Sequence, residues 1–131
     1  MSVPLINKVD CLCLPVSDLA EALAFYSDRL GQELIWRTST AVGLRLPDSA
    51  AELVLQIEGR PPEVDLVVNS VPEAIERFRA AGGRLLTGPF DIQIGKCAVV
   101  ADPWGNELVL LDQSKGPLKT DLHGNVVSAG D

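Results

Sequence analysis

Short runs of alternating hydrophobic and polar residues fill most of the first half of the chain. Alternation with a period of two predicts strands, because successive side chains of a strand point to opposite faces. The strands predicted in this way lie at residues 8–16, 33–38, 41–46 and 51–57. A stripe of helical spacing separates the first two and consists of Leu19, Leu23, Tyr26 and Leu30. Ser17 and Asp18 can cap this helix and Gly31 can end it, which gives the order β-α-β-β-β.

The same order returns in the second half. A strand at 63–69 precedes a helix that begins at Ser70, carries Val71, Ile75 and Phe78 on one stripe, and ends at Gly82-Gly83. Three further strands are predicted at 84–86, about 96–101 and 107–112. A loop with Gly88-Pro89 follows the first of them, and the turn residues of 102–106 join the last two.

Matching positions in the two halves indicate a tandem repeat. Asp18 and Ser70, Ala22 and Ala74, and Gly31 and Gly83 are each 52 residues apart, and Glu-Leu-Val-Leu at 52–55 recurs at 107–110. We therefore expect one domain over 1–131, with module one at about 6–58, module two at about 62–112 and a tail at 113–131. The tail is polar at its start, and its pattern fits an edge strand, an arm onto a partner or an unstructured end.

Composition narrows the classes of function. The chain has 131 residues, 47% of them hydrophobic, and a formal net charge of −7. This negative charge disfavours binding to nucleic acid or to anionic membranes. It either serves to keep the protein soluble or attracts cationic small molecules. The sequence shows neither an apolar run of ~18 residues nor a signal peptide, so we expect a cytoplasmic protein.

The three cysteines do not form a familiar metal or disulfide pattern. Cys11, Cys13 and Cys97 are an odd number without CxxC spacing. Cys11 and Cys13 share one face of the first strand because they are two positions apart and side chains alternate between the faces. We expect both to be small buried apolar groups rather than metal ligands.

Three motifs resemble those of the vicinal oxygen chelate superfamily, which includes glyoxalase I, extradiol dioxygenases, methylmalonyl-CoA epimerase and fosfomycin- and bleomycin-resistance proteins. The first is Pro15-Val16-Ser17-Asp18-Leu19 with Phe25-Tyr26 and Leu30-Gly31, the second Ala80-Ala81-Gly82-Gly83, and the third Asp102-Pro103-Trp104-Gly105-Asn106. The resemblance spans about residues 6–112. It implies an α+β fold in which two tandem βαβββ modules form a curled mixed-sheet cup with the helices outside.

The alternation assigns residues to the two faces of the implied sheet. The side chains expected to face the helices are Leu12, Leu14, Leu53, Leu55, Leu66, Leu108 and Leu110. Those expected to face the cup are Cys11, Cys13, Glu52, Val54, Gln56, Glu63, Asp65, Val67, Glu107, Val109 and Leu111.

The resemblance also predicts where a metal would be held. Superfamily enzymes use His and Glu side chains from several cup strands, and the four equivalent positions here are Cys11, Val54, Glu63 and Val109. Valine cannot ligate, and the single histidine, His123, lies in the tail. We therefore expect no metal and no cofactor. An atypical site with Cys11, Glu63, Asp65, Glu52 and Glu107 stays an alternative, although Glu52 and Glu107 are expected in solvent at the rim.

These observations favour binding over catalysis. The resemblance is strongest in character to the bleomycin-resistance branch, so we expect a cytoplasmic homodimer that sequesters an aromatic or cationic compound, for example an antibiotic. No catalytic residue is assigned. Trp104 is expected to cover the end of the sheet. For Trp36 and Phe90, packing in the core and stacking on a ligand are equally compatible with the sequence. The candidate ligand-binding residues are Cys11, Cys13, Trp36, Val54, Gln56, Glu63, Asp65, Phe90, Trp104 and Val109. The alternatives are a superfamily lyase, isomerase or dioxygenase with an atypical metal site, and a non-catalytic structural or interaction module.

Overall fold

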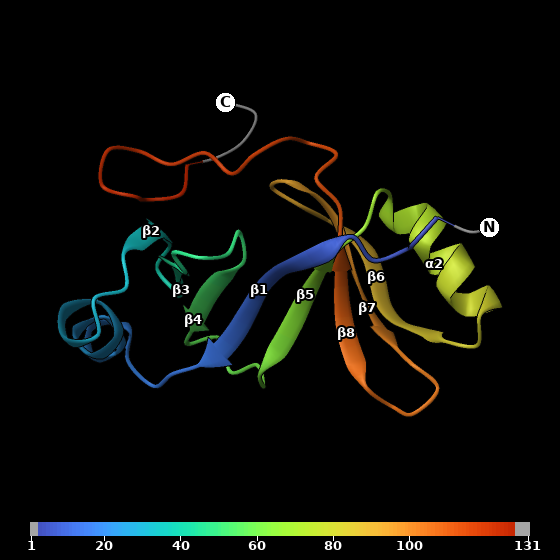
Figure 1. The fold of residues 1–131 in the computed structure, drawn as a ribbon, viewed down its shortest axis with the longest axis horizontal. Helices are drawn as coiled ribbons and strands as arrows, with labels where there is room; N and C mark the ends of the chain where they lie inside the picture. Colours follow the sequence, from blue (N-terminus) through green and yellow to red (C-terminus); the bar gives the residue numbers. More distant parts are fainter. Residues whose placement is uncertain (1–2, 128–131) are drawn as a thin grey trace. The chain divides into compact units, whose positions relative to one another are not determined.

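The computed structural model describes residues 3–127, which divide into two compact units (Figure 1). Module one comprises residues 10–63 with the tail from Lys119, and module two comprises residues up to Val9 with Val64–Leu118. Each has four strands and one helical segment in the order β-α-β-β-β. No helix within residues 3–127 is long and apolar enough to cross a membrane.

Module one is built on the strands β1 (Lys8–Pro15), β2 (Leu34–Arg37), β3 (Ala41–Arg45) and β4 (Glu52–Gln56), in the spatial order β2-β3-β4-β1. β1 runs parallel to β4, and the other pairs are antiparallel. The helical segment packs on one face, with Ala22 against Val42, Leu44 and Leu55. The alternation of side chains leaves the opposite face to Cys11, Cys13 and Val54.

The helical segment of module one changes its winding halfway. Asp18 caps α1 (Leu19–Leu23) by accepting a hydrogen bond from the Glu21 backbone N–H, as the sequence predicts. The chain then continues as a π-helix, η1 (Ala24–Arg29), in which the Leu30 N–H donates to the Phe25 carbonyl. Leu19, Leu23 and Tyr26 of the predicted stripe pack against the core of the module, whereas Leu30, at the end of the π-helix, is 55% exposed.

Module two repeats the arrangement with β5 (Glu63–Val67), β6 (Arg84–Ile92), β7 (Gly95–Ala101) and β8 (Glu107–Leu111), in the spatial order β5-β8-β7-β6. β5 is parallel to β8, as β1 is to β4. The helix α2 (Val71–Ala80) begins at the cap Ser70 and buries Val71, Ala74 and Ile75 against Leu66, Ala98, Val100 and Leu110.

The strand predicted at 84–86 is longer in the structure. β6 continues through Gly88 and Pro89 to Ile92, and its pairing with β7 shifts register between Leu85 and Thr87 and again between Thr87 and Phe90. β6 is the last strand in the order, and proline is tolerated in such strands and at bulges because its missing N–H is not needed there. The predicted strand ends before the turn residues Gly88 and Pro89, but the register shifts accommodate both residues within β6.

The α+β class and the two βαβββ modules with mixed strand pairing are confirmed. Most leucines assigned to the helix face also pack there, namely Leu14, Leu53, Leu55, Leu66, Leu108 and Leu110. Leu12 is the exception, with 43% of its surface exposed.

A buried carboxylate joins three elements of module two. Asp112, which is 2% exposed, accepts hydrogen bonds from the backbone N–H of Val71 at 2.8 Å and of Lys96 at 2.9 Å, and from the Ser114 hydroxyl at 2.8 Å. Burial alone would raise its pKa, but these donors outweigh burial, and the pKa of Asp112 lies below its ordinary value. The carboxylate therefore connects the ends of β8 and β7 to the first turn of α2.

Replacing Asp112→Asn puts an amide NH₂ against backbone N–H donors and should lower the free energy of unfolding by about 1–3 kcal/mol. Urea denaturation at neutral pH measures the loss, with the exposed Glu107→Gln of β8 as the control. Folding lowers the pKa of Asp112 below its ordinary value of 3.8. The stabilisation by the carboxylate is therefore fully present above pH 3.8 and is lost as the pH falls through the pKa of the folded state. Equal stability and equal acid sensitivity of the two variants would contradict this role.

Candidate functional site

Trp36 is positioned by a glycine on the neighbouring strand. In the β2–β3 pairing Trp36 lies opposite Gly43, and a Cβ atom at Gly43 would overlap the indole atoms Nε1, Cε2 and Cδ1. The ring therefore occupies the space that a side chain at position 43 would fill. Its Nε1–H donates a hydrogen bond of 2.6 Å to Glu52 Oε1 on β4, so both the ring plane and its polar edge are held.

Around this ring lies a cluster of small apolar side chains. Cys11, Cys13 and Val54 are buried and pack with Trp36. The strand register explains the grouping, because Cys13 lies opposite Val54 and Val54 lies opposite Gly43. We call this group the Trp36 seat; it consists of Cys11, Cys13, Trp36, Gly43, Val54 and Glu52.

Glu52 is the charged member of the Trp36 seat. Partial burial raises the pKa of its carboxyl, and the hydrogen bond from Trp36 offsets only part of that effect. The negative charge of Asp10 adds to this rise in the pKa, and the positive charge of Arg45 opposes it without cancelling it. The prediction that Glu52 lies in solvent at the rim is wrong, because the indole of Trp36 covers it; the corresponding Glu107 of module two is exposed, as predicted.

A second polar group lies beside the seat, at the start of the connector. The fully buried Gln56 donates to the Arg60 carbonyl at 2.7 Å and accepts from the Glu58 backbone N–H at 2.7 Å, which fixes the turn. The Arg60 guanidinium forms ion pairs with Glu58 and Glu63, and its Nη2 lies 3.8 Å from Cys13 Sγ. Gln56 and Glu63 are therefore both engaged in holding Arg60 next to the seat.

The remaining candidates lie in module two. Asp65 faces Val109 across the β5–β8 pair, and Val109 packs with Val67, Leu111 and Cys97. Phe90 pairs with Cys97 near the start of β7 and is 42% exposed. Trp104 lies beyond the end of β7, in the turn before β8, and is 84% exposed. Phe90 and Trp104 are thus at opposite ends of β7.

The structure therefore brings four predicted residues, Cys11, Cys13, Trp36 and Val54, into one cluster, with Gln56 and Glu63 in the adjacent network. Gly43 is not among the predicted residues, and the contacts of Glu52 with Trp36 and of Arg60 with Cys13 were not predicted. One signal was available, because a glycine inside a strand often marks the close approach of another group. The turn predicted at 38–40 would place residue 42 opposite Trp36, whereas in the structure Thr38 bonds to Ala41 across a shorter turn and Gly43 lies opposite Trp36.

The four positions that the resemblance assigns to a metal do not suit one. Val54 and Val109 offer no donor atom. Cys11 is buried among Cys13, Val54 and Trp36, and Glu63 forms an ion pair with Arg60. The donor set of the superfamily enzymes is thus not reproduced at these four positions.

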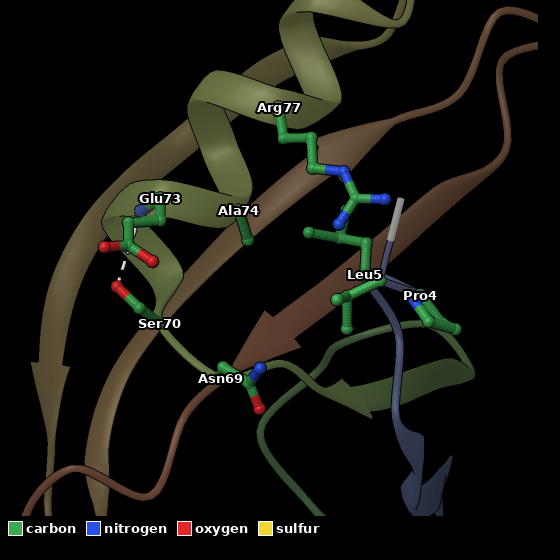
Figure 2. Close-up of a pocket in the computed structure, with 8 residues that line it drawn as sticks. Pro4, Leu5, Asn69, Ser70, Glu73, Ala74 and Arg77 are labelled. Atoms are coloured by element: carbon green, nitrogen blue, oxygen red, sulfur yellow. Dashed lines mark hydrogen bonds between the residues drawn. The ribbon is translucent and has the colours of Figure 1, made fainter. Parts of the chain in front are cut away.

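Figure 2 shows a separate pocket of about 260 Å³ in module two. It lies between the N-terminal segment and α2 and is lined by Val3, Pro4, Leu5, Asn69, Ser70, Glu73, Ala74 and Arg77. The helix N–H groups at Val71 and Glu73 already donate to Asp112 and Ser70. The first turn of α2 therefore does not offer these donors to a ligand in the pocket.

Comparison with known proteins agrees with this fold. The family model of the Glyoxalase/Bleomycin resistance protein/Dioxygenase superfamily matches residues 8–110. No curated protein sequence matches the chain significantly.

Solved structures of several enzymes share the fold at low sequence identity. Methylmalonyl-CoA epimerase from Mycobacterium tuberculosis is 20% identical with a TM-score of 0.68, and the match covers 86% of this chain and 91% of the epimerase. An extradiol ring-cleaving dioxygenase from B. fuscum is 24% identical with a TM-score of 0.60 over 84% of this chain and 33% of the dioxygenase. The Mn(II)-bound glyoxalase from Novosphingobium aromaticivorans is 15% identical with a TM-score of 0.60 over 97% and 42%.

If Gly43 makes room for the Trp36 ring, Gly43→Ala should destabilise the protein by about 1–3 kcal/mol through overpacking. The same substitution in a Trp36→Ala background should change stability by less than about 0.5 kcal/mol, because the overlapping ring is gone. Denaturant unfolding of the four proteins completes this double-mutant cycle. An equal cost in both backgrounds would show that the ring does not occupy the space beside Gly43.

Proposed function

The chain belongs to the glyoxalase/bleomycin resistance protein/dioxygenase superfamily, and we propose that it binds a flat, cationic aromatic compound on the Trp36 seat, without a metal and without changing it chemically. One observation carries the proposal: the indole of Trp36 lies over Gly43 while its N–H is held by the half-buried Glu52. An antibiotic of this chemistry, sequestered unchanged, is an example of such a ligand.

The geometry defines the chemistry of the ligand. Because the indole N–H already donates to Glu52, a ligand would bind Trp36 through its aromatic face. A cation over that face contributes about 0.5–2 kcal/mol of cation–π attraction to the binding free energy. Cys11, Cys13 and Val54 are buried and pack with the ring, so they support it with apolar, polarisable groups. Glu52 supplies a negative charge that its surroundings compensate incompletely, so a cationic group is preferred over a neutral or anionic one.

Metal-dependent catalysis is the alternative that the enzymes of similar fold suggest. Their sequence identities of 15–24% support a common fold and leave the chemistry of this chain open. The donor set argues against the superfamily's metal arrangement, because two of its four positions are valines. A binding function needs none of those donors, and the Trp36 seat provides the contacts that it does need.

The proposal predicts that N-methylquinolinium binds more tightly than its neutral and anionic counterparts, 1-methylnaphthalene and 1-naphthoate. Glu52→Gln keeps an acceptor for Trp36 but removes the charge, and Trp36→Leu removes the aromatic face. Each should weaken the binding of N-methylquinolinium about tenfold, equivalent to about 1.4 kcal/mol. Isothermal titration calorimetry in EDTA measures the affinity, with Trp104→Phe as the unaffected control.

Lowering the pH provides a further test. Burial raises the pKa of Glu52 above its ordinary value, so the affinity should decline as the pH is lowered and the carboxylate takes up its proton. In Glu52→Gln this decline should be absent. Equal affinity for 1-naphthoate, dependence of binding on added metal, or recovery of a chemically altered ligand would refute the proposal.

A further inference from the structure

The tail contains a second copy of the turn that joins β7 to β8. Both segments have the pattern Asp-x-x-Gly-Asn, at 102–106 and at 121–125. In the first, Asp102 Oδ1 accepts from the backbone N–H of residues 104 and 106, and Oδ2 accepts from the Asn106 side chain. In the second, Asp121 accepts the same three hydrogen bonds, from the backbone of 123 and 125 and from the Asn125 side chain.

The backbone of the two loops also matches. The Asp102 N–H donates to the Asn106 carbonyl and the Asp121 N–H to the Asn125 carbonyl, both at 2.9 Å. Gly105 and Gly124 have positive φ angles of 86° and 81°. The same hydrogen bonds, with burial opposing them only weakly, lower the pKa of Asp102 and Asp121 below the ordinary value. The tail loop is therefore an ordered turn with its own hydrogen bonds.

This tail loop is attached to the strand that carries Trp36. The Arg37 N–H donates to the Gly124 carbonyl at 2.7 Å, and the Val126 N–H donates to the Arg37 carbonyl at 2.9 Å. These are the backbone groups of β2 that point away from β3, and the tail satisfies them through an isolated bridge between Arg37 and Asn125.

The fit is close at Gly124. A Cβ atom there would lie 3.3 Å from the Ile35 carbonyl oxygen and 3.8 Å from Trp36 Cα. At Gly105, the equivalent glycine of module two, a Cβ atom would meet nothing within 4 Å. The two loops thus have the same internal geometry, but only the tail loop packs against a strand at this point.

We propose that the tail loop, residues 121–125, is a positioning element for Trp36 that holds its backbone from the edge of β2 while Gly43 and Glu52 hold its ring. β2 has four residues and a register shift between Leu34 and Trp36, so its pairing with β3 alone constrains Trp36 weakly. The effect of the tail loop on ligand affinity rests on the proposed function, whereas its effect on the position of the Trp36 ring does not. A loosened Trp36 occupies its bound orientation for a smaller fraction of the time, and affinity falls by that fraction.

The test compares Gly124→Ala with Gly105→Ala, both in a Trp104→Phe background in which Trp36 is the only tryptophan. Both substitutions place a Cβ at a positive φ, so their local strain is matched, but only the first presses on β2. Acrylamide quenching of Trp36 fluorescence reports the exposure of the ring without any ligand. Titration with N-methylquinolinium reports affinity. Asp121→Ala and Asp102→Ala form a second matched pair if circular dichroism shows that a glycine variant does not fold.

We expect Gly124→Ala to increase acrylamide quenching of Trp36 and to weaken N-methylquinolinium binding about fivefold. A fivefold loss corresponds to a Trp36 ring that occupies its bound orientation for about one fifth of the time. Gly105→Ala should leave both unchanged. Equal quenching in the two glycine variants would overturn the positioning role. Increased quenching in Gly124→Ala, together with no binding by the unaltered protein, would support the positioning role and refute the proposed function.

Discussion

The absence of a side chain at Gly43 is the constraint on which the candidate site depends. It leaves room for the Trp36 indole against the sheet, and from there the indole N–H reaches Glu52 on β4. A larger residue at position 43 would push the ring away, leaving Glu52 without this donor. A single strand glycine thus determines both where the aromatic surface lies and how strongly the carboxylate is desolvated.

The two modules share an order of elements but use polar groups differently. In module two the buried Asp112 joins strand ends to the first turn of α2, and its hydrogen bonds lower its pKa. In module one Glu52 accepts a hydrogen bond from Trp36, and burial, assisted by Asp10 and opposed by Arg45, dominates its pKa. A fully satisfied carboxylate stabilises the fold, whereas an incompletely satisfied one can gain from a cationic ligand. This contrast supports placing the proposed binding site in module one.

Local patterns were enough to predict most of the fold. Runs of hydrophobic residues located all eight strands within residues 3–127, although only the start of β6, and the caps Asp18 and Ser70 located the helix starts, because these features depend on neighbouring residues. Leu30 continues the stripe of Leu19, Leu23 and Tyr26 in the sequence but lies outside their cluster, because a π-helix has more residues per turn than an α-helix. The strand predicted at 84–86 is too short because register shifts carry β6 through Gly88-Pro89. At the site, Cys11, Cys13 and Val54 followed from alternation, but the contact between Trp36 and Glu52 crosses two strand pairings. The placement of the tail loop on Arg37 likewise depends on a long-range pairing.

The most direct test is an NMR titration of ¹⁵N-labelled protein with N-methylquinolinium, following the two indole N–H resonances of Trp36 and Trp104. The Trp36 indole N–H donates to Glu52 with an N-to-O distance of 2.6 Å, so its proton should resonate downfield of the Trp104 indole proton. We predict that the Trp36 resonance shifts as the ligand is added. The Trp104 indole, on an exposed turn, should remain unchanged. A titration that shifts Trp104 and leaves Trp36 unchanged, or that shifts neither, would contradict the proposal that the Trp36 seat is the binding site.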